Sequence, residues 1–175
     1  MNKTRVLFVC MGNICRSPAA EGVLRALVKR GGFADRVEIA SAGTIGLHAG
    51  ELPDSRMRSA AAKRGYTLTS RARKFAPSDF KRFDLILTMD EDNRRDVLNQ
   101  ATTDADRQRV RPFVEFCRKH RASLVPDPYY GGPEGFERVL DLLEDGCAGI
   151  LDTITQTTPR GNTPDATTAE CTVSE

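Results

Sequence analysis

The sequence predicts an α/β fold: a single domain with a central four-stranded parallel twisted sheet and helices on both faces, in the flavodoxin-like, doubly wound manner. Apolar, β-rich segments alternate with helical patterns along the chain, which is typical of parallel sheets. The first such segment, residues 4–9, is almost wholly apolar, as expected of a strand buried on both faces. A length of 175 residues is enough for one domain with a substantial hydrophobic core.

The first helix is expected directly after a short polar loop that follows the first strand. Ser17 is predicted to cap its N-terminus, with Pro18 as the first helical residue, and the pair Gly31 and Gly32 is predicted to end it. Pro112 lies inside the last predicted strand, where a proline is unfavourable. The later predicted elements are strands over residues 37–42, 83–89 and 110–116, and helices over residues 54–64, 91–100 and 136–154.

Composition predicts one domain over residues 1–155 and a disordered tail over residues 156–175, which has few apolar residues. The net charge is +2, which provides no strong field for nucleic acid or membrane. No apolar run is long enough to cross a bilayer, and the N-terminus lacks a signal-peptide pattern. Five scattered cysteines do not match a secreted disulfide scaffold. We therefore expect a monomeric cytoplasmic protein with no nucleic-acid partner and no membrane insertion.

The loop between the first strand and the first helix, CMGNICRS, has the properties of an anion site. Cys10 lies at the carboxyl end of the strand, where such sheets bind ligands. Backbone N–H groups in a tight loop before a helix converge on one point and attract an anion. Gly12 and Asn13 accept the left-handed backbone angles that such a loop needs. Arg16 supplies a planar fork that matches two phosphate oxygens.

The same environment favours a thiolate at Cys10 near neutral pH. A thiolate that faces a bound phosphoryl group is a nucleophile in position, so the hypothesis is attack on phosphorus while Arg16 and the loop hold the charged oxygens. The spacing Cys-x5-Arg alone is weak support, and the alternative is that Cys10 is a small buried hydrophobe at a strand end. The strand before the loop and the helix after it favour the nucleophile.

At this loop the sequence resembles a known family. VLFVCMGNICRSP, residues 6–18, resembles the phosphate-binding loop of the low-molecular-weight protein tyrosine phosphatases. SAGT at 41–44, PDSR at 53–56, DLILTMDEDN at 84–93 and VPDPYYGG at 125–132 also resemble family segments and follow in family order. The resemblance implies a phosphotyrosine phosphatase that uses a phosphocysteine intermediate and needs no metal or cofactor. It implies phosphotyrosine proteins as substrates and a tyrosine kinase as a candidate partner.

A second catalytic group is required because a phenolate is a poor leaving group near neutral pH. Asp127 stands between Pro126 and Pro128, which stiffen its backbone, and a loop after the last strand can return to the rim that carries Cys10. The pattern alone leaves a turn aspartate equally open. The resemblance implies that Asp127 protonates the leaving tyrosine oxygen and then acts as the base for the hydrolytic water.

The resemblance assigns further residues around this centre. The resemblance implies that one of the two tyrosines, Tyr129 and Tyr130, lines the substrate cleft. It also implies that both are phosphorylated by a partner kinase. Met11 and Leu47 match the other side of the cleft, and Leu47 stands where many relatives carry an aromatic residue. The loop residues that the resemblance assigns to phosphate binding are Met11, Gly12, Asn13, Ile14, Cys15 and Ser17.

A supporting hydrogen-bond network is also implied by the resemblance. Asn13, Ser17 and Ser41 match residues that hold the loop, and Ser17 matches a donor to the Cys10 thiolate. Ser70 stands in the stretch where some relatives complete this network with a histidine. The resemblance favours a protective role for Cys15, by a disulfide with Cys10 under oxidation, over the alternative of a thiol that only packs. Asp90 and Asn93 are predicted to be structural.

Four other functions are weighed against this one. Thioredoxin-coupled arsenate reductases share the fold but need two further cysteines in mid-chain, and no cysteine lies between Cys15 and Cys117. Protein-arginine phosphatases of the same family tend to carry threonine where Ile14 stands, so Ile14 favours phosphotyrosine. A phosphate-binding module without turnover is disfavoured by the joint presence of a nucleophile, an arginine and the candidate acid, Asp127. Scattered arginines alone are typical of solvated faces, not of nucleic-acid binding.

Overall fold

The structure, a computed structural model, describes residues 2–157. Its centre is one four-stranded sheet, and every strand pairs in parallel with its neighbours, so the predicted fold class is confirmed. The order across the sheet is β2-β1-β3-β4, which places β1 and β3 in the middle. The strands are β1 (Thr4–Cys10), β2 (Val37–Gly43), β3 (Leu85–Thr88) and β4 (Val110–Pro112).

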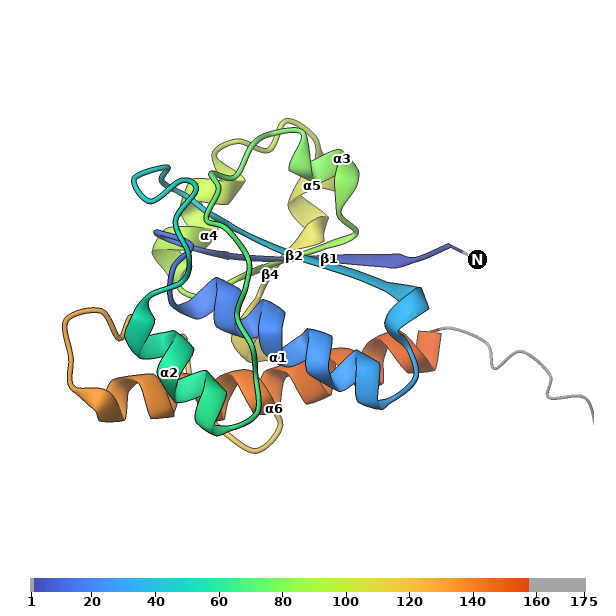
Figure 1. Cartoon of the computed structure of the whole chain (residues 1–175). Helices are drawn as coiled ribbons and strands as arrows, with labels where there is room; N and C mark the ends of the chain where they lie inside the picture. The colour runs from blue at the N-terminus through green and yellow to red at the C-terminus, as the bar shows by residue number, and fades with distance from the viewer. Residues whose placement is uncertain (1, 158–175) are drawn as a thin grey trace, which may run out of the picture.

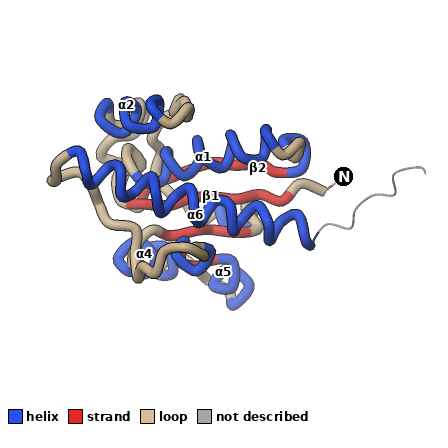
Figure 2. The backbone as a smooth tube through the Cα atoms, turned by 90° about the horizontal axis from the view of Figure 1, so that it is seen from below, coloured by secondary structure: helices blue, strands red, loops and turns tan. Residues whose placement is uncertain are grey.

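Helices cover both faces of the sheet, as Figure 1 shows. One face carries α1 (Arg16–Arg30), α2 (Ser55–Lys63) and α6 (Pro133–Thr157), and Figure 2 shows α1 and α6 side by side across it. The other face carries α3 (Asp79–Arg82), α4 (Glu91–Leu98) and α5 (Asp104–Arg109). Two short 3₁₀ turns complete the described elements, η1 (Ala34–Arg36) and η2 (Phe113–Phe116).

The alternation of side chains along β1 divides the core into two layers. Val6 and Phe8 pack into the cluster formed with α1 and α6, whereas Leu7 and Val9 pack into the smaller cluster on the opposite face. All four side chains are fully buried. This is the physical reason for the unbroken apolar run that predicted the strand, and it makes β1 a rigid support for the residue at its carboxyl end.

Several predicted boundaries were wrong: β3 is shorter than residues 83–89, α4 ends before residue 100, and two further differences have a clear physical reason. Helix α1 begins at Arg16 with Cys15 in the N-cap position, because the Ser17 hydroxyl bonds to groups of the neighbouring loop and strand and does not cap the helix. The strand predicted over residues 110–116 ends at Pro112, which cannot donate a ladder hydrogen bond, and residues 113–116 form η2. The short helices α3 and α5 were not predicted.

Helix α6 is longer than predicted at both ends. It begins at Pro133 and continues to Thr157, so the first two residues of the predicted tail are helical. The rest of that tail lies outside the described residues. Within residues 2–157, none of the helices is long and apolar enough to cross a membrane.

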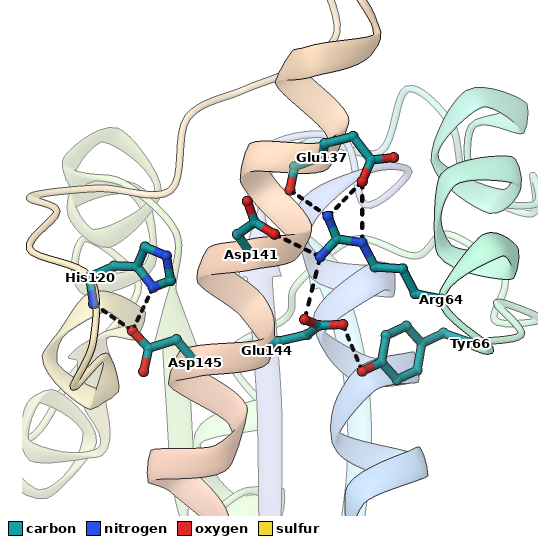
Figure 3. Close-up of polar contacts among 7 residues, drawn as sticks. All are labelled: Arg64, Tyr66, His120, Glu137, Asp141, Glu144 and Asp145. Atoms are coloured by element: carbon teal, nitrogen blue, oxygen red, sulfur yellow. Dashed lines mark hydrogen bonds and ion pairs between the residues drawn. The ribbon is translucent and has the colours of Figure 1, made fainter.

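An arginine at the end of α2 ties that helix to α6 (Figure 3). Arg64 forms ion pairs with Glu137, Asp141 and Glu144, which lie along one side of α6. The Tyr66 hydroxyl donates to Glu144 at 2.9 Å. The C-terminal end of α2 is therefore held on α6. Its N-terminal end has separate contacts, with the loop between β1 and α1.

A buried carboxylate directly after Glu144 on α6 holds the segment that follows η2 (Figure 3). Asp145 accepts hydrogen bonds from the backbone N–H groups of Arg118, Lys119 and His120, and it contacts His120 Nδ1 at 2.9 Å. Burial raises the pKa of Asp145, but these hydrogen bonds lower it more, so the net shift is downward. Helix α6 thus anchors the start of the loop that leads to Asp127.

Candidate active site

The loop between β1 and α1 is shaped by its contact with the segment after β2. Pairing continues beyond the strand ends, because the Thr44 N–H donates to the Cys10 carbonyl and the Ile45 N–H donates to the Met11 carbonyl. Asn13 has φ 57°, in the left-handed region predicted for this loop. At Gly43 a Cβ atom would lie 2.6 Å from the Met11 carbonyl oxygen. Only glycine allows the loop to lie this close to β2.

The thiol at the end of β1 faces a hydroxyl from the first turn of α1. Cys10 Sγ lies 2.9 Å from Ser17 Oγ, and both residues are buried. Asn13 Nδ2 donates to Ser17 Oγ at 2.8 Å, and Ser17 Oγ lies 3.3 Å from the Ala42 carbonyl oxygen. Because the amide of Asn13 uses the hydroxyl as an acceptor, the hydroxyl proton is available to Cys10 or to the Ala42 carbonyl.

The side-chain oxygen of Asn13 is held by a backbone N–H group. Its Oδ1 accepts from the Arg73 N–H at 3.0 Å, and the Arg73 guanidinium is itself fixed on the buried Asp79. Arg73 lies in the same stretch as Ser70, and its backbone N–H supplies the contact on this side of Asn13. Ser41 differs from the expectation, because its hydroxyl points toward α1 and donates to Glu21 Oε2 at 2.6 Å.

The guanidinium of Arg16 is buried at the same edge of the sheet. Its Nη1 donates to Asp90 Oδ2 and to the Val125 carbonyl at 3.1 Å, and its Nη2 lies 3.5 Å from Asp127 Oδ2. Burial lowers the pKa of Arg16, but the neighbouring Cys10 and the hydrogen-bonded Asp90 raise it, and the net direction is upward. A fixed positive charge therefore lies between the Cys10 loop and the loop that follows Val125.

Asp127 comes to this edge because its loop is pinned to the end of β3. The Val125 N–H donates to the Met89 carbonyl at 2.8 Å. Asp127 Oδ1 accepts from the Tyr129 N–H at 3.1 Å, while the other carboxylate oxygen faces Arg16. The Asp127 side chain is 44% exposed, so it reaches both the protein interior and a ligand that enters from solvent.

These groups share one cavity of about 200 Å³. Tyr129 and Tyr130 contribute to its lining, and their rings meet edge to face with centroids 4.9 Å apart. Leu47 is 75% exposed and Tyr130 96% exposed, so both stand at the rim. The predicted site residues that line the cavity are Cys10, Met11, Gly12, Ile14, Cys15, Arg16, Leu47, Asp127, Tyr129 and Tyr130. Ile45 and His48, which the sequence did not single out, also line it.

A thiol, a buried guanidinium and a carboxylate around one cavity are the side chains that a cysteine-dependent phosphatase requires. The model of the low molecular weight phosphotyrosine protein phosphatase family matches residues 5–160. The chain belongs to this family. It is therefore an enzyme of the protein-tyrosine-phosphatase class, which confirms the resemblance inferred from the loop.

Individual relatives cover almost the whole phosphatase domain. A Synechocystis protein that carries the family description is 47% identical over 150 residues, which span 86% of this chain and 96% of the relative. The low molecular weight phosphotyrosine protein phosphatase of Schizosaccharomyces pombe is 44% identical over 151 residues, which span 86% of this chain and 96% of the relative. A crystal structure of a protein tyrosine phosphatase from Entamoeba histolytica, with Hepes in its active site, superposes with a TM-score of 0.85. It is 42% identical and covers 88% of this chain and 98% of its own.

One residue of the phosphatase site was undervalued from the sequence. Asp90 follows β3 and caps α4 by accepting from the Asn93 N–H at 2.8 Å, as a structural aspartate does. Its second oxygen binds Arg16 and orients the guanidinium. The position of Asp90 directly after β3 could have indicated this role. Strands β1 and β3 are parallel neighbours, so the residues after their carboxyl ends meet at one edge of the sheet.

The second thiol of the phosphatase loop, Cys15, is buried. Burial raises the pKa of Cys15 to about 12, and the nearby negative charge of Asp54 acts in the same direction. Cys15 is therefore a neutral thiol near neutral pH.

Proposed function

We propose that this phosphatase hydrolyses phosphotyrosine in proteins through a phosphocysteine intermediate on Cys10, without a metal ion. The Cys10 thiolate attacks phosphorus, and the P–O bond to tyrosine breaks as Asp127 gives its proton to the leaving oxygen. Asp127 then takes a proton from water, whose oxygen attacks phosphorus. The P–S bond breaks, inorganic phosphate leaves, and the Cys10 thiolate is restored.

The surrounding groups stabilise charge in both steps. The Arg16 fork and the loop N–H groups from Met11 to Ser17 bind the non-bridging phosphate oxygens, and the N-terminus of α1 adds its positive end. The Ser17 hydroxyl, 2.9 Å from Cys10 Sγ, stabilises the thiolate when it is the attacking and then the leaving group. Fixed protein charges thus supply the electrostatic role that a metal ion has in other phosphatases.

The observation that carries the proposal is the bridging position of Arg16. It follows Cys10 in the phosphate loop, and its Nη2 lies 3.5 Å from the Asp127 carboxylate, which belongs to another loop. A phosphoryl group bound by Arg16 is therefore placed between the nucleophile and the acid.

Cavity composition supports an aryl phosphate as the substrate. Tyr129 and Tyr130 offer ring surfaces beside the nucleophile, and Ile14 contributes an apolar side chain where a guanidinium substrate would need a polar contact. A cytoplasmic location, a monomeric state, a tyrosine kinase as partner, and a domain limit at residue 155 stay predictions from the sequence.

The test compares hydrolysis of a phosphotyrosine peptide with phosphoserine and phosphoarginine peptides in the presence of EDTA. Wild type should cleave phosphotyrosine, Cys10→Ser should be inactive, and Asp127→Ala should be slower by about 10²–10⁴-fold. Rapid acid quenching followed by mass spectrometry should find phosphate on the peptide that contains Cys10. Faster cleavage of phosphoarginine would overturn the substrate assignment, and loss of activity in EDTA would overturn metal independence.

A further inference from the structure

A chain of hydrogen bonds joins the phosphate loop to the loop that carries Asp127. It begins at Ile14, whose carbonyl accepts from the Asp54 N–H at 2.7 Å. It ends at Tyr129, whose N–H donates to Asp127 Oδ1. The first turn of α2 lies between the two ends, and in Figure 1 the start of α2 lies beside the orange loop that precedes α6.

Asp54 and Arg56 form the middle of this chain. The Asp54 carboxylate caps α2 by accepting from the Arg56 N–H at 2.8 Å, and it also accepts from Arg56 Nε at 3.1 Å and Nη2 at 2.9 Å. These contacts turn the guanidinium back toward the N-terminus of its own helix. The pairing lowers the pKa of Asp54, with the Arg56 side-chain hydrogen bond as the largest cause.

The remaining nitrogen of the Arg56 guanidinium holds the loop that carries Asp127. Its Nη1 donates to the Tyr129 carbonyl at 3.1 Å. The guanidinium carbon also lies 5.3 Å from the centroid of the Tyr129 ring and 4.9 Å from that of Phe136, within the range of cation–π attraction. Tyr129 is thus held at its carbonyl and its ring by Arg56, while its N–H holds the carboxylate of Asp127.

We propose that Arg56 is a positioning residue for general acid catalysis, which holds Asp127 in register with the phosphate bound by the nucleophile loop. The inference rests on the proposed role of Asp127 as the acid. Arg56 itself lines a neighbouring groove with Phe136 and Lys63, and it is not among the residues that line the catalytic cavity. Its effect on the reaction therefore passes through Tyr129 and Asp127.

A purely structural role for Arg56 predicts a different result. The other end of α2 is anchored on α6 by Arg64, so removal of the Arg56 side chain leaves the helix attached. Loss of a structural tether lowers the rate for all substrates alike. Loss of acid alignment lowers it most where the leaving group needs a proton.

The experiment measures kcat/KM for a series of aryl phosphates, from nitrophenyl to unsubstituted phenyl, and plots its logarithm against the pKa of the leaving phenol. The variants are Arg56→Met, Arg56→Lys and Asp127→Asn. Arg58→Met is the matched control, because Arg58 lies on the same helix but donates to the Pro53 carbonyl. Thermal unfolding of each variant identifies any that fails to fold.

Arg56→Met should lower kcat/KM for phenyl phosphate by about 10-fold or more and change it little for the nitrophenyl ester, so that the slope becomes steeper, as in Asp127→Asn. Arg56→Lys keeps the positive charge but loses the guanidinium fork, so the slope for this variant should shift in the same direction. This variant replaces Arg56→Met in the test if the methionine variant does not fold. Arg58→Met should keep the wild-type slope. A parallel fall across the series in the Arg56 variants overturns the inference alone. An unchanged slope in Asp127→Asn overturns the acid assignment and the inference with it.

Discussion

The Ser17 hydroxyl lies 2.9 Å from the Cys10 sulfur and does not cap its own helix. A hydrogen bond to an ionised group contributes about 1.5–3 kcal/mol. Ser17→Ala should therefore slow alkylation of Cys10 by iodoacetate at neutral pH by about 10-fold or more. The control is Ser59→Ala, an exposed serine on α2. An unchanged alkylation rate in Ser17→Ala would show that the hydroxyl does not stabilise the thiolate.

Arg16→Lys should keep the positive charge and lose the fork. A lysine presents one ammonium group, which cannot bind two phosphate oxygens while it is held by Asp90 and the Val125 carbonyl. We expect kcat/KM for a phosphotyrosine peptide to fall by about 10²-fold or more. Arg95→Lys on α4, where the exposed Arg95 pairs with the carboxylates of Asp92 and Asp96, should keep wild-type activity. Near-normal turnover in Arg16→Lys would argue against bidentate binding.

Gly43→Ala should displace the phosphate loop. The added Cβ would lie 2.6 Å from the Met11 carbonyl oxygen and 3.1 Å from the Asn13 nitrogen, and neither backbone atom can rotate away. Overpacking of this kind costs about 1–3 kcal/mol, and kcat/KM should fall with the stability. The control is Gly46→Ala, where the nearest atoms are Lys74 side-chain carbons at 3.6 Å. Equal kinetics and equal thermal unfolding of the two variants would contradict the close approach.

The lowered pKa of Asp145 predicts how the stability of the folded protein changes with pH. Its pKa is lowered in the folded protein, so its contribution is complete above the ordinary aspartate range and is lost as pH falls through the folded pKa. Asp145→Asn should destabilise the protein by about 2 kcal/mol at neutral pH, since charge-assisted hydrogen bonds are lost. The difference from wild type should shrink as the solution becomes more acidic than about pH 4. Asp152→Asn, an exposed partner of Arg118, should change stability little at any pH.

The neutral state of Cys15 predicts selective chemistry within one loop. At neutral pH, iodoacetamide should modify Cys10 and leave Cys15 unmodified, because the pKa of Cys15 is raised to about 12. Cys15→Ser should keep most of the phosphatase activity. After exposure to peroxide, wild type should regain activity with dithiothreitol and Cys15→Ser should not, if the thiol protects by a disulfide with Cys10. Equal recovery of both proteins would leave Cys15 a packing residue.

The strand, loop and first helix could be predicted because their signals are local. An apolar run, residues that accept left-handed angles and a Gly-Gly end lie within residues 4–32, and they place Cys10 and Arg16 at one edge of the sheet. The loop also carries the family resemblance. Asp127 needed that resemblance, because Asp-Pro alone is equally typical of a turn.

Other features depend on contacts that local patterns do not contain. Asp90 acts on a residue 74 positions away, and Arg56 acts on one 73 positions away. Helix α3 has four residues, too few for a periodic pattern. Helix α5 has Ala105 as its one apolar residue, and its Thr103 capping box with Asp106 was the available signal. Ser17 was misassigned because the cap pattern and the hydrogen bond to Cys10 require the same type of residue.

The contrast between a buried phosphate loop and an exposed rim has a consequence for inhibitor design. A compound that occupies only the anion site contacts Cys10, Arg16 and backbone N–H groups, which any enzyme with this loop offers. Selectivity must therefore come from an extension past the anion toward Leu47 and Tyr130, which are exposed at the mouth of the cavity. An aliphatic group at Leu47 should disfavour scaffolds that depend on aromatic stacking at that position and admit bulkier saturated ones.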